Sequence, residues 1–107
     1  MKKIAILGFG KEGQSLLRFL RTSPAYKNSA ITICDMNQRL MLRKSHFHNV
    51  SFRLRLGKNY LDHLEQFDTI FRSPGIPYLH PAIQRTKKKG VKITSATKLF
   101  FELAKPI

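Results

Sequence analysis

The sequence predicts an α/β protein with a Rossmann-like fold of three layers (α/β/α), in which helices cover both faces of a parallel five-stranded sheet. Short apolar runs alternate along the whole chain with segments whose apolar residues recur at helical spacing. A Gly-x-Gly-x-x-Gly sequence at residues 8–13 separates the first apolar run from the first helical segment. Such alternation is typical of parallel strands joined by right-handed helical crossovers.

Five short apolar runs are expected to form the strands. Most are apolar at consecutive positions, as in strands buried on both faces of a sheet. The third run alternates apolar residues with Ser or Arg, which predicts an edge strand with one wetter face. Gly57 ends this run, and Ser73-Pro74 ends the next one. In chain order, the five runs lie at residues 3–7, 30–34, 50–56, 69–71 and 91–94.

Each strand is followed by a predicted helix. The first helix is expected from Gln14, where leucines begin to recur at helical spacing, to Ser23-Pro24, which stops it. Asn37 is expected to cap a short second helix with apolar residues at positions 40–42. A third short helix is expected over residues 59–66.

The last two helices have clear boundary signals. His80-Pro81 opens the fourth helix, because proline fits the first helical turn, and Gly90 closes it. The fifth helix is expected to be capped by Ser95 or Thr97.

The composition restricts the class of protein. With 107 residues and 42% hydrophobic content, the chain is large enough for one domain with a single core. No apolar run approaches the ~20 residues that span a bilayer, and the apolar start ends at Lys11-Glu12, too early for a signal peptide. We therefore expect a cytoplasmic protein without a membrane partner. The single cysteine, Cys34, excludes an internal disulfide and is expected to be a reduced thiol in the core.

Ligands of parallel α/β sheets bind beyond the carboxyl ends of the strands. Three predicted loops lie there, at residues 8–13, 35–37 and 73–76. In the first loop, Gly8 permits a tight turn, Gly10 lets the backbone approach a phosphate, and Gly13 allows close packing of the helix on the strand. The helix start then offers free N–H groups to an anion. A glycine turn without a ligand is the alternative interpretation.

The other two loops carry polar groups that could face the same cleft. In dinucleotide-binding enzymes, an acid about 20 residues after the glycine motif accepts hydrogen bonds from ribose hydroxyls. Asp35 fits that role and suggests an NAD(P)-binding domain, but it could instead cap the following helix. In the third loop, Pro74 stiffens a turn in which Gly75 can take a positive φ, and Ser73 could present its hydroxyl. An ordinary turn is the alternative there.

No set of residues predicts a catalytic or metal site. His46 and His48 could pair on a metal, but no suitable third ligand lies near them in sequence, so we expect none. Asp62 and Glu65 are expected to share a helix face rather than to act as acid and base, and His63 beside them is expected at the surface. The chain has no Gly-x-x-x-x-Gly-Lys-Ser/Thr loop, and we assign no catalytic residue.

The charge of the chain is unusual. Twenty Lys and Arg residues against six Asp and Glu give a net charge of +14, an excess that attracts anions. The basic residues are spread along the chain, and the one run, Lys87-Lys88-Lys89, has no interleaved aromatic residues for base stacking. We interpret the charge mainly as a solvated surface. A nucleic-acid-binding module remains an alternative, though nucleic acid is not the expected partner.

Several segments together resemble the start of the Mur ligases that add D-glutamate. They are residues 6–15 (ILGFGKEGQS), 33–35 (ICD), 67–76 (FDTIFRSPGI), 80–81 (HP), 90–94 (GVKIT) and 98–103 (KLFFEL). The most specific part is the pairing of Asp-x-Ile with Ser-Pro-Gly-Ile after an amino-terminal glycine turn. The resemblance covers essentially the whole chain.

The resemblance implies that residues 1–107 are the N-terminal domain that binds UDP-N-acetylmuramoyl-L-alanine. The full ligase would have three domains and act in cytoplasmic peptidoglycan synthesis, on which cell shape and cell division depend. ATP and Mg would bind to the second domain and D-glutamate to the third. This chain contains neither of them, so on its own it is expected to hold no cofactor and to be inactive.

The resemblance also implies ten substrate-binding residues. Those along the nucleotide and its diphosphate would be Gly10, Lys11, Glu12 and Gly13. Those that flank the uracil would be Asp35, Met36 and Asn37, and those that form the opposite wall would be Ser73, Pro74 and Gly75.

Overall fold

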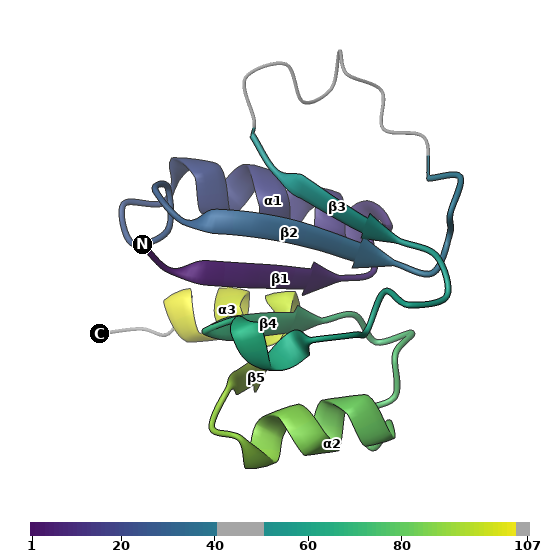
Figure 1. Ribbon diagram of the computed structural model, residues 1–107. Helices are drawn as coiled ribbons and strands as arrows, with labels where there is room; N and C mark the ends of the chain where they lie inside the picture. The colour runs from purple at the N-terminus through teal and green to yellow at the C-terminus, as the bar shows by residue number, and fades with distance from the viewer. Residues whose placement is uncertain (41–50, 105–107) are drawn as a thin grey trace.

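The computed structural model describes residues 1–40 and 51–104. Its centre is a five-stranded sheet in which all neighbouring strands are parallel, in the order β3-β2-β1-β4-β5 (Figure 1). The strands are β1 (Lys3–Leu7), β2 (Ala30–Asp35), β3 (Arg53–Leu56), β4 (Thr69–Arg72) and β5 (Lys92–Thr94). The predicted parallel five-stranded sheet is therefore confirmed.

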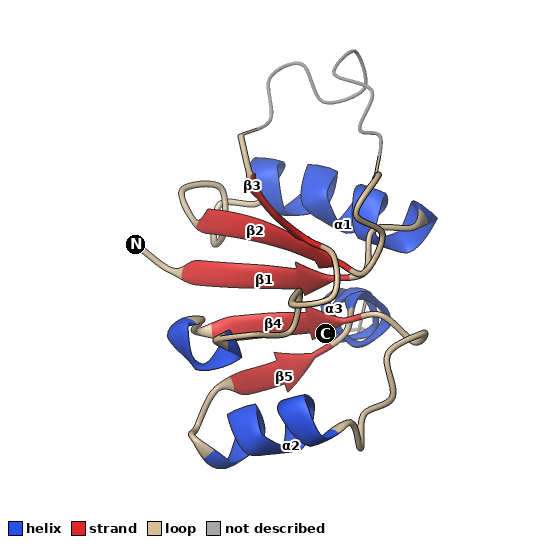
Figure 2. Ribbon diagram, turned by 45° about the vertical axis from the view of Figure 1, so that its right-hand side comes forward, coloured by secondary structure: helices blue, strands red, loops and turns tan. Residues whose placement is uncertain are grey.

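Helices cover both faces of the sheet, which completes the predicted three layers (Figures 1 and 2). One face packs against α1 (Lys11–Thr22) and α3 (Ala96–Leu103), and the other against α2 (Pro81–Lys88) and the short 3₁₀ helix η2 (Leu64–Gln66). Because side chains alternate along a strand, Ile4 and Ile6 of β1 belong to the first core, whereas Ala5 and Leu7 belong to the second.

The first core depends on the amphipathic helix α1. Leu16, Leu17 and Leu20 are at most 1% exposed, and burial of each such side chain stabilises the fold by about 1.5–3 kcal/mol. Phe19 of α1 meets Phe100 of α3 edge to face, with ring centroids 5.4 Å apart. The two helices on this face therefore support each other as well as the sheet.

Three helix ends follow local signals. The imidazole Nδ1 of His80 accepts a hydrogen bond from the Ala82 N–H (3.1 Å) at the start of α2, and Gly90 takes a φ of +91° after its end. Of the two candidates for the α3 cap, Ser95 is the one that caps, because its hydroxyl accepts from the Lys98 N–H (3.1 Å). The first helix starts at Lys11, earlier than predicted, because the backbone of Gly10 rather than the leucine pattern sets its N-cap.

Two predicted helices are corrected. Residues 58–63 form turns and only Leu64–Gln66 is helical, since His63 takes a φ of +56° and interrupts any longer helix. After Asn37 the described chain forms a turn, closed by the Leu40 N–H donating to the Asn37 carbonyl (3.2 Å). Residues 41 and 42 of that predicted helix lie outside the described residues, as do His46 and His48.

The third strand is an edge strand, as predicted, but shorter, since its described part is Arg53–Leu56. The expected apolar face is wrong at Leu54, whose side chain is 47% exposed. Gly57, with a φ of +96°, ends the strand.

Candidate functional site

The carboxyl ends of β1, β2 and β4 lie side by side, so the three loops that follow them meet at one edge of the sheet (Figure 2). Backbone hydrogen bonds join these loops directly. The Gly8 N–H donates to the Cys34 carbonyl (2.7 Å), and the Ser73 N–H donates to the Leu7 carbonyl (3.0 Å). The predicted convergence of the three loops is therefore observed.

The glycines of the first loop meet the steric demands expected of them. Gly8 takes a φ of +89°, and a Cβ there would lie 2.8 Å from the Cβ of Ser73. A Cβ on Gly13 would lie only 2.6 Å from the carbonyl oxygen of Gly8, so only glycine allows α1 to pack this closely on the turn. Around Gly10, by contrast, a Cβ would meet nothing within 4 Å. Space is therefore open beside the start of α1.

The start of α1 offers hydrogen-bond donors to that space. Its N-cap residue, Gly10, has no side chain to cap the helix, and the first N–H groups of a helix have no partner within it. Lys11 and Glu12 are exposed, and the Glu12 carboxylate accepts from the Thr97 hydroxyl of α3 (3.3 Å). The helix end is thus suited to an anion, and Glu12 is tied to the neighbouring helix.

Asp35 links the first two loops. One carboxylate oxygen accepts from the Phe9 N–H and the other from the Asn37 N–H, both at 2.8 Å. Asn37 in turn accepts from the Arg39 N–H through its side chain (3.0 Å). The two predicted roles of Asp35, binding ribose hydroxyls and capping the next helix, do not include the bond to Phe9. That bond joins residues 26 positions apart in the sequence. Met36, at 66% exposure, and Asn37 extend from this link into solvent.

The third loop is a tight turn. The Ile76 N–H donates to the Ser73 carbonyl (3.0 Å), and the Gly75 N–H approaches the Ser73 hydroxyl (3.4 Å). Gly75 does not use the positive φ that was expected of it. Arg72 braces the turn, since its guanidinium donates to the Ile76 carbonyl (2.6 Å) and lies 5.6 Å from the ring centre of Tyr78.

Only three of the ten predicted site residues line a common pocket, and that pocket is small. Glu12, Gly13 and Ser73 line a narrow pocket of about 10 Å³, which is roughly the space of one water molecule. Ala96 of α3 also lines this pocket, and sequence reasoning did not assign it. Its position directly after the Ser95 cap, at the carboxyl end of the fifth strand, was the signal that could have found it. Six other predicted residues are exposed on the three loops and do not line the pocket: Gly10, Lys11, Met36, Asn37, Pro74 and Gly75.

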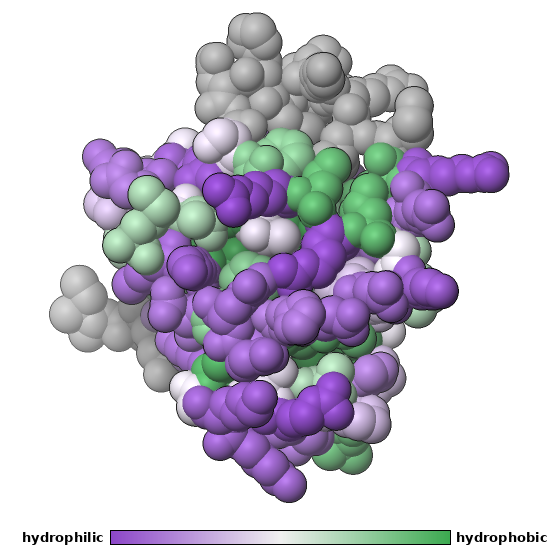
Figure 3. All heavy atoms as spheres, in the orientation of Figure 1, coloured by the Kyte–Doolittle hydropathy of each residue, from purple (hydrophilic) through white to green (hydrophobic). Residues whose placement is uncertain are grey.

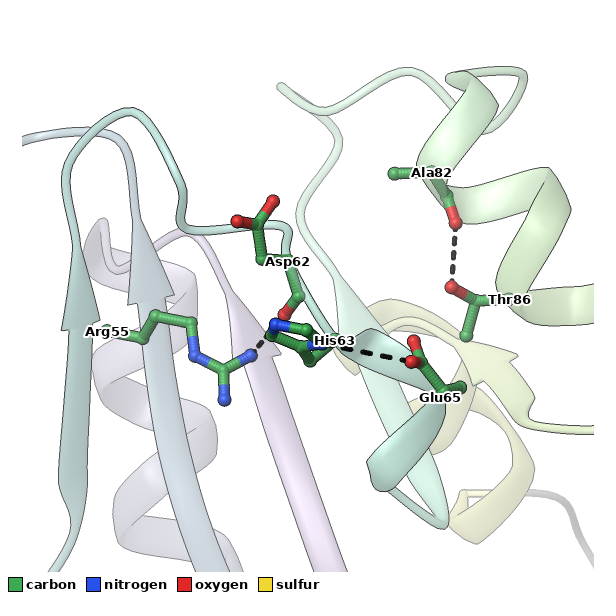
Figure 4. A network of polar contacts seen from close by, with 6 residues as sticks. All are labelled: Arg55, Asp62, His63, Glu65, Ala82 and Thr86. Carbon is green, nitrogen blue, oxygen red and sulfur yellow. Dashed lines mark hydrogen bonds and ion pairs between the residues drawn. The ribbon is translucent and has the colours of Figure 1, made fainter.

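The histidine and acidic side chains near residues 62–65 form no metal centre in the described part of the chain. His63 is exposed and lies 3.9 Å from the carboxylate of Glu65, while the guanidinium of Arg55 binds the Asp62 carbonyl (Figure 4). Asp62 and Glu65 therefore do not share a helix face as expected. Within the described residues, no three His, Cys, Asp or Glu side chains are grouped as metal ligands.

Cys34 lies beneath the site. Its side chain is fully buried in the second core and is a free thiol, as expected. Burial raises its pKa to about 11, and the nearby charge of Arg55 opposes that increase. The thiol is thus neutral at ordinary pH and unsuited to act as a nucleophile.

The surface is largely hydrophilic, as the face in Figure 3 shows, and hydrophobic side chains occur on it in separate patches. No helix among residues 1–40 and 51–104 has the length and apolar character needed to cross a bilayer.

Comparison with known proteins identifies the family to which the chain is similar. The family described as "Mur ligase MurD-like, N-terminal domain" matches residues 2–95. Proteins named UDP-N-acetylmuramoylalanine–D-glutamate ligase are similar over nearly the whole chain. The one from Acetivibrio thermocellus is 36% identical over 105 residues, which are 95% of this chain and 22% of that protein.

Two further relatives with the same name agree. The one from Clostridium novyi is 31% identical over 103 residues, covering 94% of this chain and 22% of the relative. The one from Ligilactobacillus salivarius is 31% identical over 104 residues, covering 96% of this chain and 22% of the relative. The chain therefore spans about a fifth of the length of these curated relatives.

Proposed function

We propose that residues 1–107 bind UDP-N-acetylmuramoyl-L-alanine for a ligase that adds D-glutamate to it. The premise is that this chain belongs to the MurD-like N-terminal domain family of the Mur ligases. The observation that carries the proposal is the start of α1, which has no side-chain cap, opens onto unfilled space beside Gly10 and shares a narrow pocket with Ser73 of the third loop. The names of the relatives supply the chemical class of the substrate.

The diphosphate is proposed to lie along Gly10, Lys11, Glu12 and Gly13. Backbone N–H groups at a helix start carry partial positive charge, and the open space at Gly10 lets phosphate oxygens approach them. The side chain of Lys11 is exposed at the same point and adds a full positive charge. The carboxylate of Glu12 is directed to Thr97, which limits its repulsion of the phosphates.

The uracil is proposed to lie between the other two loops. Asp35, Met36 and Asn37 form one wall, in which the Asp35 carboxylate fixes the backbone and the exposed Met36 side chain offers an apolar surface to a flat base. Ser73, Pro74 and Gly75 form the opposite wall, with a hydroxyl and an N–H as polar groups.

The ligase reaction itself is proposed for the complete protein. Its ATP, Mg and D-glutamate would be held by parts that correspond to the remaining four-fifths of the relatives. The sequence given contains no phosphate-binding loop for ATP, so we expect this chain alone to bind its substrate without ligating D-glutamate. We likewise propose that the complete protein acts in peptidoglycan synthesis in the cytoplasm.

A titration followed by heteronuclear NMR tests the proposal. UDP, UDP-N-acetylmuramoyl-L-alanine and NADH are added in parallel at moderate salt. We expect the two uridine ligands to shift the amide signals of residues 10–13, 35–37 and 73–75, and NADH to leave them unchanged. Saturable binding of NADH without binding of UDP would instead support the dinucleotide interpretation and refute the proposal.

A pair of variants sharpens this test. Gly10→Leu places a side chain in the open space of the cleft, where the fold leaves room for it, and is expected to weaken UDP binding by roughly tenfold or more. Lys88→Leu introduces the same leucine side chain at the exposed end of α2, away from Gly10, and is expected to bind UDP normally. Equal affinities for the two variants would show that UDP does not use the space beside Gly10.

A further inference from the structure

A second hollow lies at the opposite end of the sheet, where β1, β2 and β3 begin and where the N-terminus is marked in Figure 1. Its volume is about 420 Å³, within the range of small-molecule sites and far larger than the pocket beside Gly13. The proposed nucleotide site does not use it. We infer that this hollow binds a small free anion that carries phosphate groups.

One residue that lines the hollow, Arg21, has a guanidinium held in position by several hydrogen bonds. Arg21, in the last turn of α1, donates through Nε to the Ser51 carbonyl (3.0 Å) and through Nη1 to the carbonyls of Lys27 (3.2 Å) and Ser29 (2.7 Å). Its Nη2 also donates to the Ser51 carbonyl, so each of these bonds to described residues is made with a neutral carbonyl oxygen. The side chain is ordered by the fold, yet its positive charge has no acidic partner in these bonds.

Further cations surround Arg21. Lys27 and Arg53 line the same hollow, and both are exposed. An adjoining hollow of about 280 Å³ shares Met1, Ala30 and Arg53 with the first and adds Lys3. None of the described residues that line either hollow is Asp or Glu. The nearby Asp68 carboxylate accepts from the backbone N–H of Lys3 (2.7 Å), so it is already engaged.

The charged groups that line the hollow indicate which class of ligand it binds. Guanidinium and ammonium groups around a concave surface without carboxylates favour an anion with several oxygens, and phosphate groups accept hydrogen bonds from Arg and Lys most effectively. Asn28, Ser29 and Ser51 add neutral polar groups to the lining. The concave shape suits a compact ligand better than a flat membrane surface or a long duplex.

The experiment is a titration with inorganic pyrophosphate, followed by heteronuclear NMR. We expect saturable shifts of the amide signals of residues 27–31 and 51–53. The double variant Lys27→Gln/Arg53→Gln is expected to weaken this binding by about tenfold or more, because both side chains line the hollow and are exposed to solvent. Lys58→Gln/Lys98→Gln removes the same charge elsewhere and is the matched control.

Several outcomes would overturn the inference. They are the absence of saturable shifts at residues 27–31 and 51–53, shifts confined to residues 10–13 and 73–75, or equal loss of affinity in the two double variants. Binding to phosphatidylglycerol vesicles through Lys27 and Arg53, with pyrophosphate silent, would assign the hollow to a lipid headgroup and also refute a free anion as its ligand. Because the two sites report on different amides, failure here leaves the uridine-binding proposal untouched, and the reverse also holds.

Discussion

The close approach of Gly13 in α1 to the carbonyl oxygen of Gly8 allows us to predict how much stability a Gly13→Ala substitution would cost. In Gly13→Ala, the new Cβ would lie 2.6 Å from that oxygen, short of an ordinary contact by roughly 0.8 Å. The new Cβ is fixed by the backbone of α1 and clashes with a backbone oxygen, so no side-chain rotation relieves the contact and α1 must move away from the turn. Overpacking of this kind costs about 1–3 kcal/mol, even though alanine favours a helix over glycine by about 1 kcal/mol at an unhindered position.

The assay is thermal and urea unfolding followed by circular dichroism. For a domain of this size, the expected loss corresponds to a decrease in Tm of roughly 5–15 °C. Gly75→Ala is the matched control, because its Cβ would meet only the Ser73 hydroxyl at 3.9 Å and the residue does not need a positive φ. We expect this control to be neutral or more stable by up to about 1 kcal/mol. A Gly13→Ala protein as stable as the Gly75→Ala protein would refute the reasoning.

Three further outcomes are expected. Asp35→Asn, which replaces a carboxylate that accepts two backbone N–H groups at 2.8 Å, should lower the free energy of unfolding by about 1–2 kcal/mol in urea titrations, whereas Asp62→Asn should change it little. Because burial raises the pKa of Cys34 from 9.0 to about 11, the unfolded thiol ionises before the folded one. Stability should therefore fall as pH rises from 9 to 11, and Cys34→Ala should show a shallower fall over the same range. Arg72→Gln, which loses the bond to the Ile76 carbonyl (2.6 Å), should weaken UDP binding by roughly tenfold in calorimetry, and unchanged affinity would contradict a positioning role for Arg72.

Features governed by neighbours in sequence could be predicted from the residues alone. The apolar run at residues 3–7 is β1, and the helix signals at His80-Pro81 and Ser95 mark the starts of α2 and α3. The spacing of Gly8 and Gly13 correctly indicated a tight turn and a close approach. Propensity, capping and side-chain periodicity act within a few residues, so the sequence contains the information directly.

Local signals failed where distant contacts or backbone geometry decided the outcome. Residues 59–66 have a helical pattern, but the left-handed conformation of His63 leaves only a short 3₁₀ helix. The role of Asp35 depended on the Phe9 N–H, which the fold brings to it from another loop. Leu54 was expected to be buried, but its position on the edge strand leaves it exposed.

By itself, the sequence determined the fold class, the order of the strands along the chain and the edge of the sheet at which three loops would meet, because hydrophobic period and strand alternation restrict topology strongly. Only the tertiary structure decided which charged groups share a surface. The basic residues are dispersed along the chain, yet the parallel sheet brings Arg21, Lys27 and Arg53 around one hollow opposite the glycine loop. Spatial clustering depends on which strands are neighbours and where each one begins, and that is a property of the folded sheet rather than of any segment of the chain.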